Sequence, residues 1–253
     1  VDQLRILEID HGPVRTIVLP TASGLEHKIS MPAMARTFRK AILWVCPGQW
    51  SFPLTLPLSW LGFPSSRTRI LFADGLPHLT ACKWISLGPI DIGLGRFQEV
   101  ACFHKPSCAL LVTDALVGIS SNPPEIFDLD PTPLLFHARD EGNQPLNDSP
   151  ELRNKGWKRL VLFASFLKPS QLQIPSINTV LKNSFKPGLR NFKSHFGIYP
   201  FQWQKGWDLS IDQIMGSTKP LLQVAPVIER LVFPRAKNVF LRWLDEIKEL
   251  DGM

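Results

Sequence analysis

The chain has 253 residues and a formal net charge of +6, from 28 Lys and Arg against 22 Asp and Glu. The basic residues are scattered, whereas a nucleic-acid binder usually concentrates them in a patch, so we expect no nucleic-acid partner. No apolar run approaches the roughly 18 to 20 residues that span a bilayer, and we expect no transmembrane segment. With 44% hydrophobic and 20% charged residues, the composition is typical of a globular protein with a substantial core.

The four cysteines form no CxxC pair. In a chain of this length they predict buried thiols in a reducing compartment rather than a disulfide framework, which favours an intracellular protein. The first residue is Val and no signal peptide is visible, as expected of a processed protein or a fragment.

The first elements alternate between helix and strand. Residues 1–10 have the apolar spacing of a helix, which ends at a Gly-Pro pair. Residues 14–19 and 41–45 are β-branched and aliphatic runs that predict buried strands, and residues 31–40 predict a helix between them. This order predicts a βαβ unit with a parallel pair of strands.

The segment that follows is irregular and then returns to strands. Residues 46–66 are too rich in Pro and aromatic residues for regular structure, and residues 67–72 and 83–87 predict short strands. Residues 97–104 and 109–113 predict a β-hairpin, with Lys-Pro-Ser at its turn.

The second half of the chain is helical in pattern. Pro226 interrupts one of the helix candidates and predicts its division into a strand and a helix. We therefore expect one domain over 1–253, with a β-rich part at 1–117 and a helix-rich part at 118–253. The helix candidates are residues 133–138, 150–167, 177–185, 208–215, 221–231 and 236–250.

Two strand ends carry polar residues that could do chemistry. Glu26 and His27 follow the loop after the first strand, and Asp114 follows the strand at 109–113. Functional groups gather where strands meet loops, and an imidazole and a carboxylate suit zinc, iron or manganese. The alternative is structural: His27 packs at a helix start and Asp114 caps a turn.

Other residues are candidates for contact with a substrate. His137 and Arg139 form a polar cluster after an apolar run, and this cluster either lines a site or forms a structural ion pair. Trp50 belongs to a set of Trp and Phe residues that either forms an apolar pocket or packs over the core. That set contains Trp50, Phe52, Trp60, Phe63, Trp203 and Trp207.

Several long blocks together resemble one family, the cyanobacterial and plastid proteins with domain of unknown function 4336. That family is similar in turn to the metallo-β-lactamase superfamily, which implies an αββα sandwich that binds one or two metal ions at its strand ends. The blocks are VRTIVLPTASGLEHK, AILWVCPGQWSFPLTLPLSWLG, FHKPSCALLVTDALV, PPEIFDLDPTPLLFHARD, GWKRLVLFASF and GIYPFQW.

The resemblance implies a reduced metal site. Of the superfamily's T-H-x-H-x-D-H loop only the last His matches, at His27, with Glu26 in place of the acidic residue. Asp114 matches the metal-bridging Asp. The superfamily's opening strands and its last His-bearing strand have no counterpart here, which implies a partial sandwich, cut at both ends, with a helical C-terminal region.

From these residues we expect a metallo-hydrolase-like protein with a degenerate metal site. His27 and Asp114 would be ligands to one divalent metal, Glu26 a ligand or general base, and His137, Arg139 and Trp50 substrate contacts. Either the protein hydrolyses an ester or related bond with metal-bound water, or it binds no metal and acts as a non-catalytic binding or assembly protein. The substrate would be a small molecule in the first case and the partner a protein in the second. The resemblance implies a chloroplast or a cyanobacterial cytoplasm.

Overall fold

The chain divides into two compact units. The first contains Val1–Leu116 and Ile228–Met253, and the second contains Val117–Val227. The structure is a computed structural model. It describes residues 2–22, 26–49, 55–93, 95–142, 144–166, 171–188, 199, 201–213 and 221–252.

A parallel sheet in the first unit confirms the predicted βαβ unit. Its strands β1 (Thr16–Leu19), β2 (Ile42–Val45) and β3 (Thr68–Ile70) lie in that order and all run parallel. Helix α3 (Met31–Thr37) connects β1 to β2, with Pro32 in its first turn, where a missing backbone N–H has no cost.

The predicted hairpin belongs to a second, antiparallel sheet of the first unit. Its strands are β4 (Cys82–Asp91), β5 (Arg96–His104) and β6 (Ala109–Leu111), with a 3-10 turn at Lys105–Ser107 between the last two. β4 is longer than the predicted strand at 83–87, because a register shift between Leu87 and Ile90 absorbs Gly88 and Pro89 and lets pairing resume.

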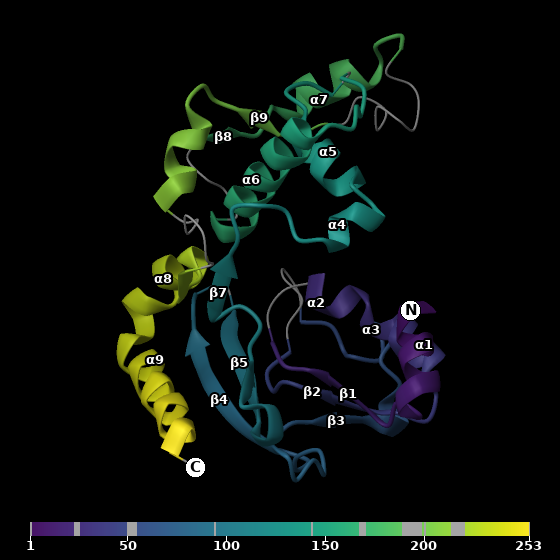
Figure 1. Ribbon diagram of the computed structural model, residues 1–253, viewed down its shortest axis with the longest axis vertical. Coiled ribbons are helices and arrows are strands. Elements are labelled where there is room, and N and C mark those ends of the chain that lie inside the picture. Colours follow the sequence, from purple (N-terminus) through teal and green to yellow (C-terminus); the bar gives the residue numbers. More distant parts are fainter. Residues whose placement is uncertain are drawn as a thin grey trace. The chain divides into compact units, whose positions relative to one another are not determined.

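The two sheets of the first unit pack face to face. β2 alternates its side chains, so Leu43 and Val45 meet α3 while Trp44 points to the other face. On that face Trp44 packs in one cluster with Val100 of β5, which joins the two sheets. Helix α9 (Phe233–Lys248) covers β4 and buries Phe240 and Trp243. In Figure 1, α9 lies on one side of β4 and β5, and the β1–β3 sheet lies on the other.

The second unit is built on two packed helices, α5 (Thr132–Ala138) and α6 (Pro150–Phe166). The predicted helix at 208–215 is instead a 3-10 helix at Trp207–Gln213. Pro226 does divide its segment, into strand β10 (Leu221–Val224) and helix α8 (Pro226–Leu231), whose residues from Ile228 onward belong to the first unit. The other elements are β7 (Leu116–Ile119), which pairs with β10, α4 (Ile126–Leu129), β8 (Leu172–Gln173), which pairs with β9 (Gln202–Trp203), and α7 (Ile177–Ser184).

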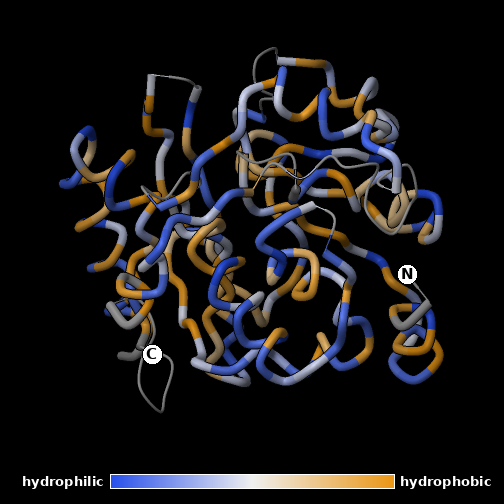
Figure 2. Tube along the Cα trace, turned by 90° about the horizontal axis from the view of Figure 1, so that it is seen from above, coloured by the Kyte–Doolittle hydropathy of each residue, from blue (hydrophilic) through white to orange (hydrophobic). Residues whose placement is uncertain are grey.

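Helix α1 (Asp2–His11) is exposed on an apolar side. Ile6, Leu7 and Ile9 are 60%, 51% and 81% exposed. The helix beside the N label in Figure 2 accordingly includes orange, hydrophobic stretches. Across the described ranges, no helix is both long and apolar enough to cross a membrane.

The contact between α5 and α6 depends on a glycine. A Cβ atom placed on Gly156 of α6 would lie 1.9 Å from the carbonyl oxygen of Leu134 in α5. Only a residue without a side chain lets the two backbones approach this closely.

We therefore expect the substitution Gly156→Ala to destabilise the protein, although Ala is intrinsically better in a helix by about 1 kcal/mol. The new methyl group must push the helices apart, and overpacking of this kind costs about 1–3 kcal/mol. Urea denaturation measures the change. Lys158→Ala on the same helix is the control, with an expected change within about 0.5 kcal/mol. A Gly156→Ala variant as stable as the control would contradict the close contact.

Candidate functional site

The structure brings His27 and Asp114 into contact across 87 positions of sequence. The imidazole Nε2 of His27 lies 3.1 and 3.2 Å from the two carboxylate oxygens of Asp114. The two side chains are 28% and 33% exposed, so a solute can reach them. Both residues belong to the first unit.

His27 is held at the carboxyl ends of two parallel strands. It lies in the short helix α2 (Glu26–Ile29), which follows β1. Ahead of that helix, Thr21 forms a β-bridge with Glu99 of β5, and the Ala22 N–H donates to the Gln98 carbonyl at 2.9 Å. Gln49, beyond the end of β2, donates its amide N–H to the Thr21 carbonyl at 2.6 Å. The loops after β1 and β2 are thus tied to each other and to β5.

Asp114 is positioned by the buried carboxylate of Glu99. Oε1 of Glu99 accepts the Thr113 N–H at 2.6 Å, and Oε2 accepts the N–H groups of Asp114 and Ala115, both at 2.9 Å. Glu99 is 0% exposed. Burial raises the pKa of Glu99, and the N–H groups of Thr113 and Asp114 oppose part of that rise. Sequence reasoning did not single out Glu99, although a carboxylate directly before the apolar run VACF, within a predicted strand, was a visible signal.

The His27–Asp114 pair has the spacing of two ligands of one metal ion. Donor atoms on neighbouring corners of a tetrahedral zinc site with bonds of about 2.1 Å lie about 3.4 Å apart. Within the described residues, however, no three His, Cys, Asp or Glu side chains gather closely enough to hold an ion. The described residues therefore fit half of a single-metal site and do not fit a two-metal centre.

Two of the expected site residues cannot be placed with this pair. Glu26 begins α2, but its side chain lies outside what the structure describes, and Trp50 lies outside the described residues altogether. Of the other aromatic candidates in the first unit, Phe63 is 2% exposed and packs in the core, whereas Trp60 is 77% exposed.

Cys46 follows β2 close to the same strand ends but is not a nucleophile. Its thiol is fully buried and donates to the Gln98 carbonyl at 3.5 Å. Burial, together with the nearby charge of Glu99 and only partly offset by Lys28, raises the pKa of Cys46 to about 12. The thiolate needed for attack is therefore absent at neutral pH.

His137 and Arg139 lie in the second unit, at the end of α5. The His137 ring packs against Phe136, Phe163 and Phe201, with ring centroids 4.9–6.1 Å away. Burial, with smaller contributions from the charges of Arg159 and Arg139, lowers the pKa of His137 to about 4. His137 is therefore a neutral member of an aromatic cluster at pH 7.

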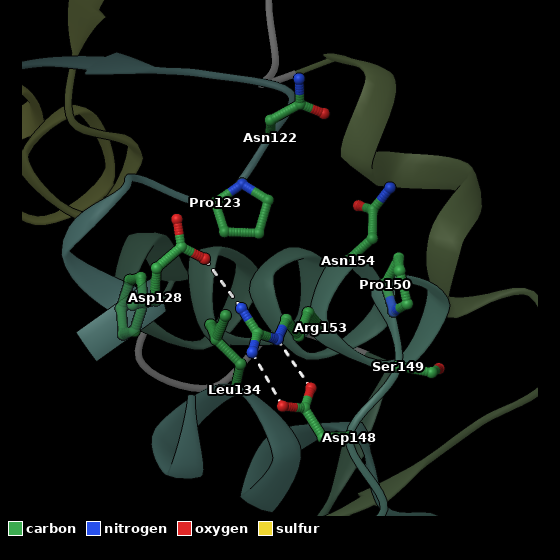
Figure 3. Close-up of a pocket in the computed structure, with 10 residues that line it drawn as sticks. Asn122, Pro123, Asp128, Leu134, Asp148, Ser149, Pro150, Arg153 and Asn154 are labelled. Atoms are coloured by element: carbon green, nitrogen blue, oxygen red, sulfur yellow. Dashed lines mark hydrogen bonds and ion pairs between the residues drawn. The ribbon is translucent and has the colours of Figure 1, made fainter. Parts of the chain in front are cut away.

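A cavity of about 580 Å³ lies beside α4 and α6 in the second unit (Figure 3). Its charged groups already pair with each other. Arg153 donates to both oxygens of Asp148 at 2.7 Å and to Asp128 at 2.8 Å. The bonds from Arg153 hold the pKa of Asp148 below its usual range.

The buried position of Glu99 predicts a stability effect for Glu99→Gln. The amide –NH₂ of Gln would face one or two of the N–H groups that the carboxylate now accepts, which leaves donors buried without an acceptor. We expect a loss of about 1–3 kcal/mol for each such group. Urea denaturation measures the loss. Gln98→Ala on the same strand is the comparison, and a smaller effect at Glu99 than at Gln98 would contradict the role of the carboxylate.

The lowered pKa of His137 predicts a pH dependence. At pH values between the pKa of about 4 in the folded protein and the usual 6.5, the unfolded chain binds a proton that the folded chain does not. Stability should therefore fall as the pH drops through this window, by up to about 1.4 kcal/mol per pH unit. His137→Gln should flatten the slope in urea denaturation between pH 6.5 and 4.5. An unchanged slope would contradict the burial of a neutral imidazole.

Comparison with known proteins gives one match. A family model described as Domain of unknown function (DUF4336) matches residues 1–253. No curated protein and no solved structure matches the chain. The match covers the whole sequence, including both halves of the His27–Asp114 pair, so the chain belongs to the DUF4336 family.

Proposed function

We propose that the protein is hydrolase-like and has a reduced metal site, in which His27 and Asp114 bind one divalent cation such as zinc, iron or manganese. One observation carries the proposal: two side chains of metal-ligand type, 87 positions apart, have donor atoms 3.1 Å from each other at a partly exposed place. Structural packing alone does not require this pair at the ends of two strands.

The arrangement of the first unit supports this proposal. Two sheets lie face to face, α3 packs on the outside of one, and α9 packs on the outside of the other. This is the layer order of the αββα sandwich that the family resemblance implies. The resemblance implies a metal site after the first parallel strand and after the hairpin, and these are the segments that carry His27 and Asp114.

Under this proposal His27, Asp114, Glu99 and Glu26 have separate roles. A bound cation would polarise an ester or related bond and lower the pKa of a water molecule. His27 and Asp114 would hold the cation, and Glu99 would keep Asp114 in place through the three backbone N–H groups. Glu26, one residue before His27, would be a further ligand or the general base.

The second candidate is a non-catalytic binding or assembly protein. It is favoured by the exposure of Trp60, which is 77% accessible in the Pro-rich segment after β2. Exposed Trp side chains are enriched in contacts between proteins. In this case the His27–Asp114 contact is a structural ion pair, and the layers of the first unit serve only as a scaffold. Under both candidates the compartment, a chloroplast or a cyanobacterial cytoplasm, stays a prediction.

Metal titration of the full chain tests the proposal. We expect isothermal titration calorimetry to show one zinc or manganese ion per chain, and His27→Ala and Asp114→Ala each to weaken binding by about 100-fold or more, since even loss of a residue behind the ligands costs 10–100-fold. His104→Ala, at the end of β5, is the control and should bind as the unaltered chain does.

Two outcomes would overturn the proposal. Binding of the same strength in the His27→Ala variant would place the ion elsewhere. No binding by the unaltered chain would leave the His27–Asp114 pair as an ion pair and favour the binding protein. In that event, replacement of the exposed Trp60 by Ala should leave stability unchanged, as expected of a side chain reserved for a partner.

A further inference from the structure

The second unit contains a long stretch of sequence without an acidic residue. Over the whole chain the basic residues are scattered, but the acidic residues are not: ten Lys and Arg and no Asp or Glu lie between Glu151 and Asp208. All 22 Asp and Glu lie outside this stretch and outnumber the Lys and Arg found there, so the net charge of +6 comes from the stretch itself. Such a charge asymmetry indicates a partner with negative charge over a wide area.

Helix α7 lies in this stretch and has a well-formed start. The Ser176 hydroxyl accepts the Thr179 N–H at 3.3 Å, which is the cap expected of a Ser in this position. Pro175 precedes the cap. The helix is therefore an ordered element of the second unit, and its side chains have defined directions.

The apolar side of α7 faces solvent. Ile177 and Leu181, with Phe185 directly after the helix, are four residues apart and lie on one side. They are 78%, 51% and 67% exposed. Val180 and Ser184, on another side, are half-buried, so the helix rests on the unit through that side. A surface helix normally turns its apolar stripe toward the core, and α7 does the reverse.

Lysines border this apolar side. Lys182 and Lys186 are exposed and directly follow Leu181 and Phe185 in the chain. Ile174, ahead of the cap, adds a further aliphatic side chain that is 61% exposed. Lysine side chains extend along an apolar surface and keep their charge at its edge. The α7 surface, as we call it, consists of Ile174, Ile177, Leu181, Lys182, Phe185 and Lys186.

Helix α4 of the same unit provides a contrast. Ile126 and Leu129 of α4 are 59% and 71% exposed, so this helix also presents apolar side chains to solvent. Their neighbours in sequence, however, are the acidic residues Glu125, Asp128 and Asp130. Negative charge at α4 repels an anionic partner, whereas the charge of the α7 surface attracts one.

We propose that the α7 surface docks on an anionic lipid membrane, with its aliphatic side chains among the headgroups and its two lysines at the level of the lipid phosphates. Helices with an apolar side and adjacent Lys or Arg bind membranes in this way and lie in the interface without crossing it. A leaflet with anionic lipids is negative over its whole area, which matches a stretch with charge of one sign. The α7 surface belongs to the second unit and the His27–Asp114 pair to the first, so either can exist without the other.

Other polyanions match the charge of this surface but not its aliphatic side chains. Nucleic acids are bound through their phosphates and by stacking of bases on aromatic rings, to which Ile and Leu contribute little. An acidic protein would need an apolar groove, rimmed by carboxylates, that receives the helix. A membrane accepts both the aliphatic side chains and the lysines without a dedicated groove.

Sedimentation of the full chain with lipid vesicles is the first test. We expect binding to vesicles made of equal parts of phosphatidylglycerol and phosphatidylcholine. Binding to vesicles of phosphatidylcholine alone should be at least about tenfold weaker, since each Lys near an anionic surface strengthens binding about fivefold. No binding to the anionic vesicles would overturn the proposal, and equal binding to both kinds would overturn the assignment to anionic lipid.

Matched variants at exposed positions locate the contact. Leu181→Ser should weaken binding to anionic vesicles about tenfold, since burial of a Leu side chain contributes about that much. Leu129→Ser makes the same change in α4 and should leave binding unchanged. Lys182→Glu should weaken binding about tenfold or more, because attraction is replaced by repulsion. Lys105→Glu changes the net charge equally in the first unit and should have a much smaller effect.

These variants also separate the membrane from the other polyanions. Vesicle binding that Leu181→Ser does not weaken would rest on charge attraction alone, as expected of a protein that binds nucleic acid or an acidic partner, and would overturn the proposal. Equal losses in Leu181→Ser and Leu129→Ser, or in Lys182→Glu and Lys105→Glu, would place the contact outside the α7 surface and overturn it as well.

Discussion

The first unit depends on one buried carboxylate. Glu99 lies on the central strand of the antiparallel sheet with no exposure to solvent, and it accepts three successive backbone N–H groups from residues 113–115. Removal of a carboxylate from water costs several kcal/mol. The loop N–H groups would also be costly if buried alone. The N–H groups of residues 113–115 stabilise the buried carboxylate, and the carboxylate gives these N–H groups an acceptor. A side chain of the neighbouring strand therefore sets the path of the loop.

The position of the His27–Asp114 pair follows from this anchor. The backbone of Glu99 bridges Thr21 just before α2, while its side chain holds the loop that carries Asp114. One residue therefore contacts both of the segments that carry the pair. Because His27 and Asp114 come from distant segments, their contact requires the strands and loops that hold them. Contacts of Glu99 with both segments fix the distance between the two side chains, whether or not a ligand is bound.

Local patterns in the sequence predicted most of the first unit. Apolar runs identified the strands, the βαβ order and the hairpin, because β1 and β2 consist almost wholly of apolar residues and Pro and Gly mark the ends of β1, β2 and β5. The pairing of His27 with Asp114 was predicted from the resemblance together with the strand-end rule. The contribution of Glu99 could not be predicted in this way, because an acidic residue in a strand shows its partners only when the chain has folded. The 3-10 form of residues 207–213 was missed for a different reason. The spacing of apolar residues does not distinguish a 3-10 helix from an α-helix.

The arginines of the second unit show that residue type alone does not predict the partners of a side chain. Arg153 pairs with two carboxylates, Arg159 donates to three carbonyl oxygens and one carboxylate, and Arg139 has two aromatic rings and one carbonyl. In the sequence, Arg139 and Asp140 are neighbours and predict an ion pair, yet Asp140 pairs with Arg159 and Lys155 instead. The deepest cations of the second unit are thus compensated unequally. A buried charge is tolerated only with a partner, and at Arg139 the faces of Phe136 and Tyr199 and the Gly142 carbonyl take the place that carboxylates have at Arg153.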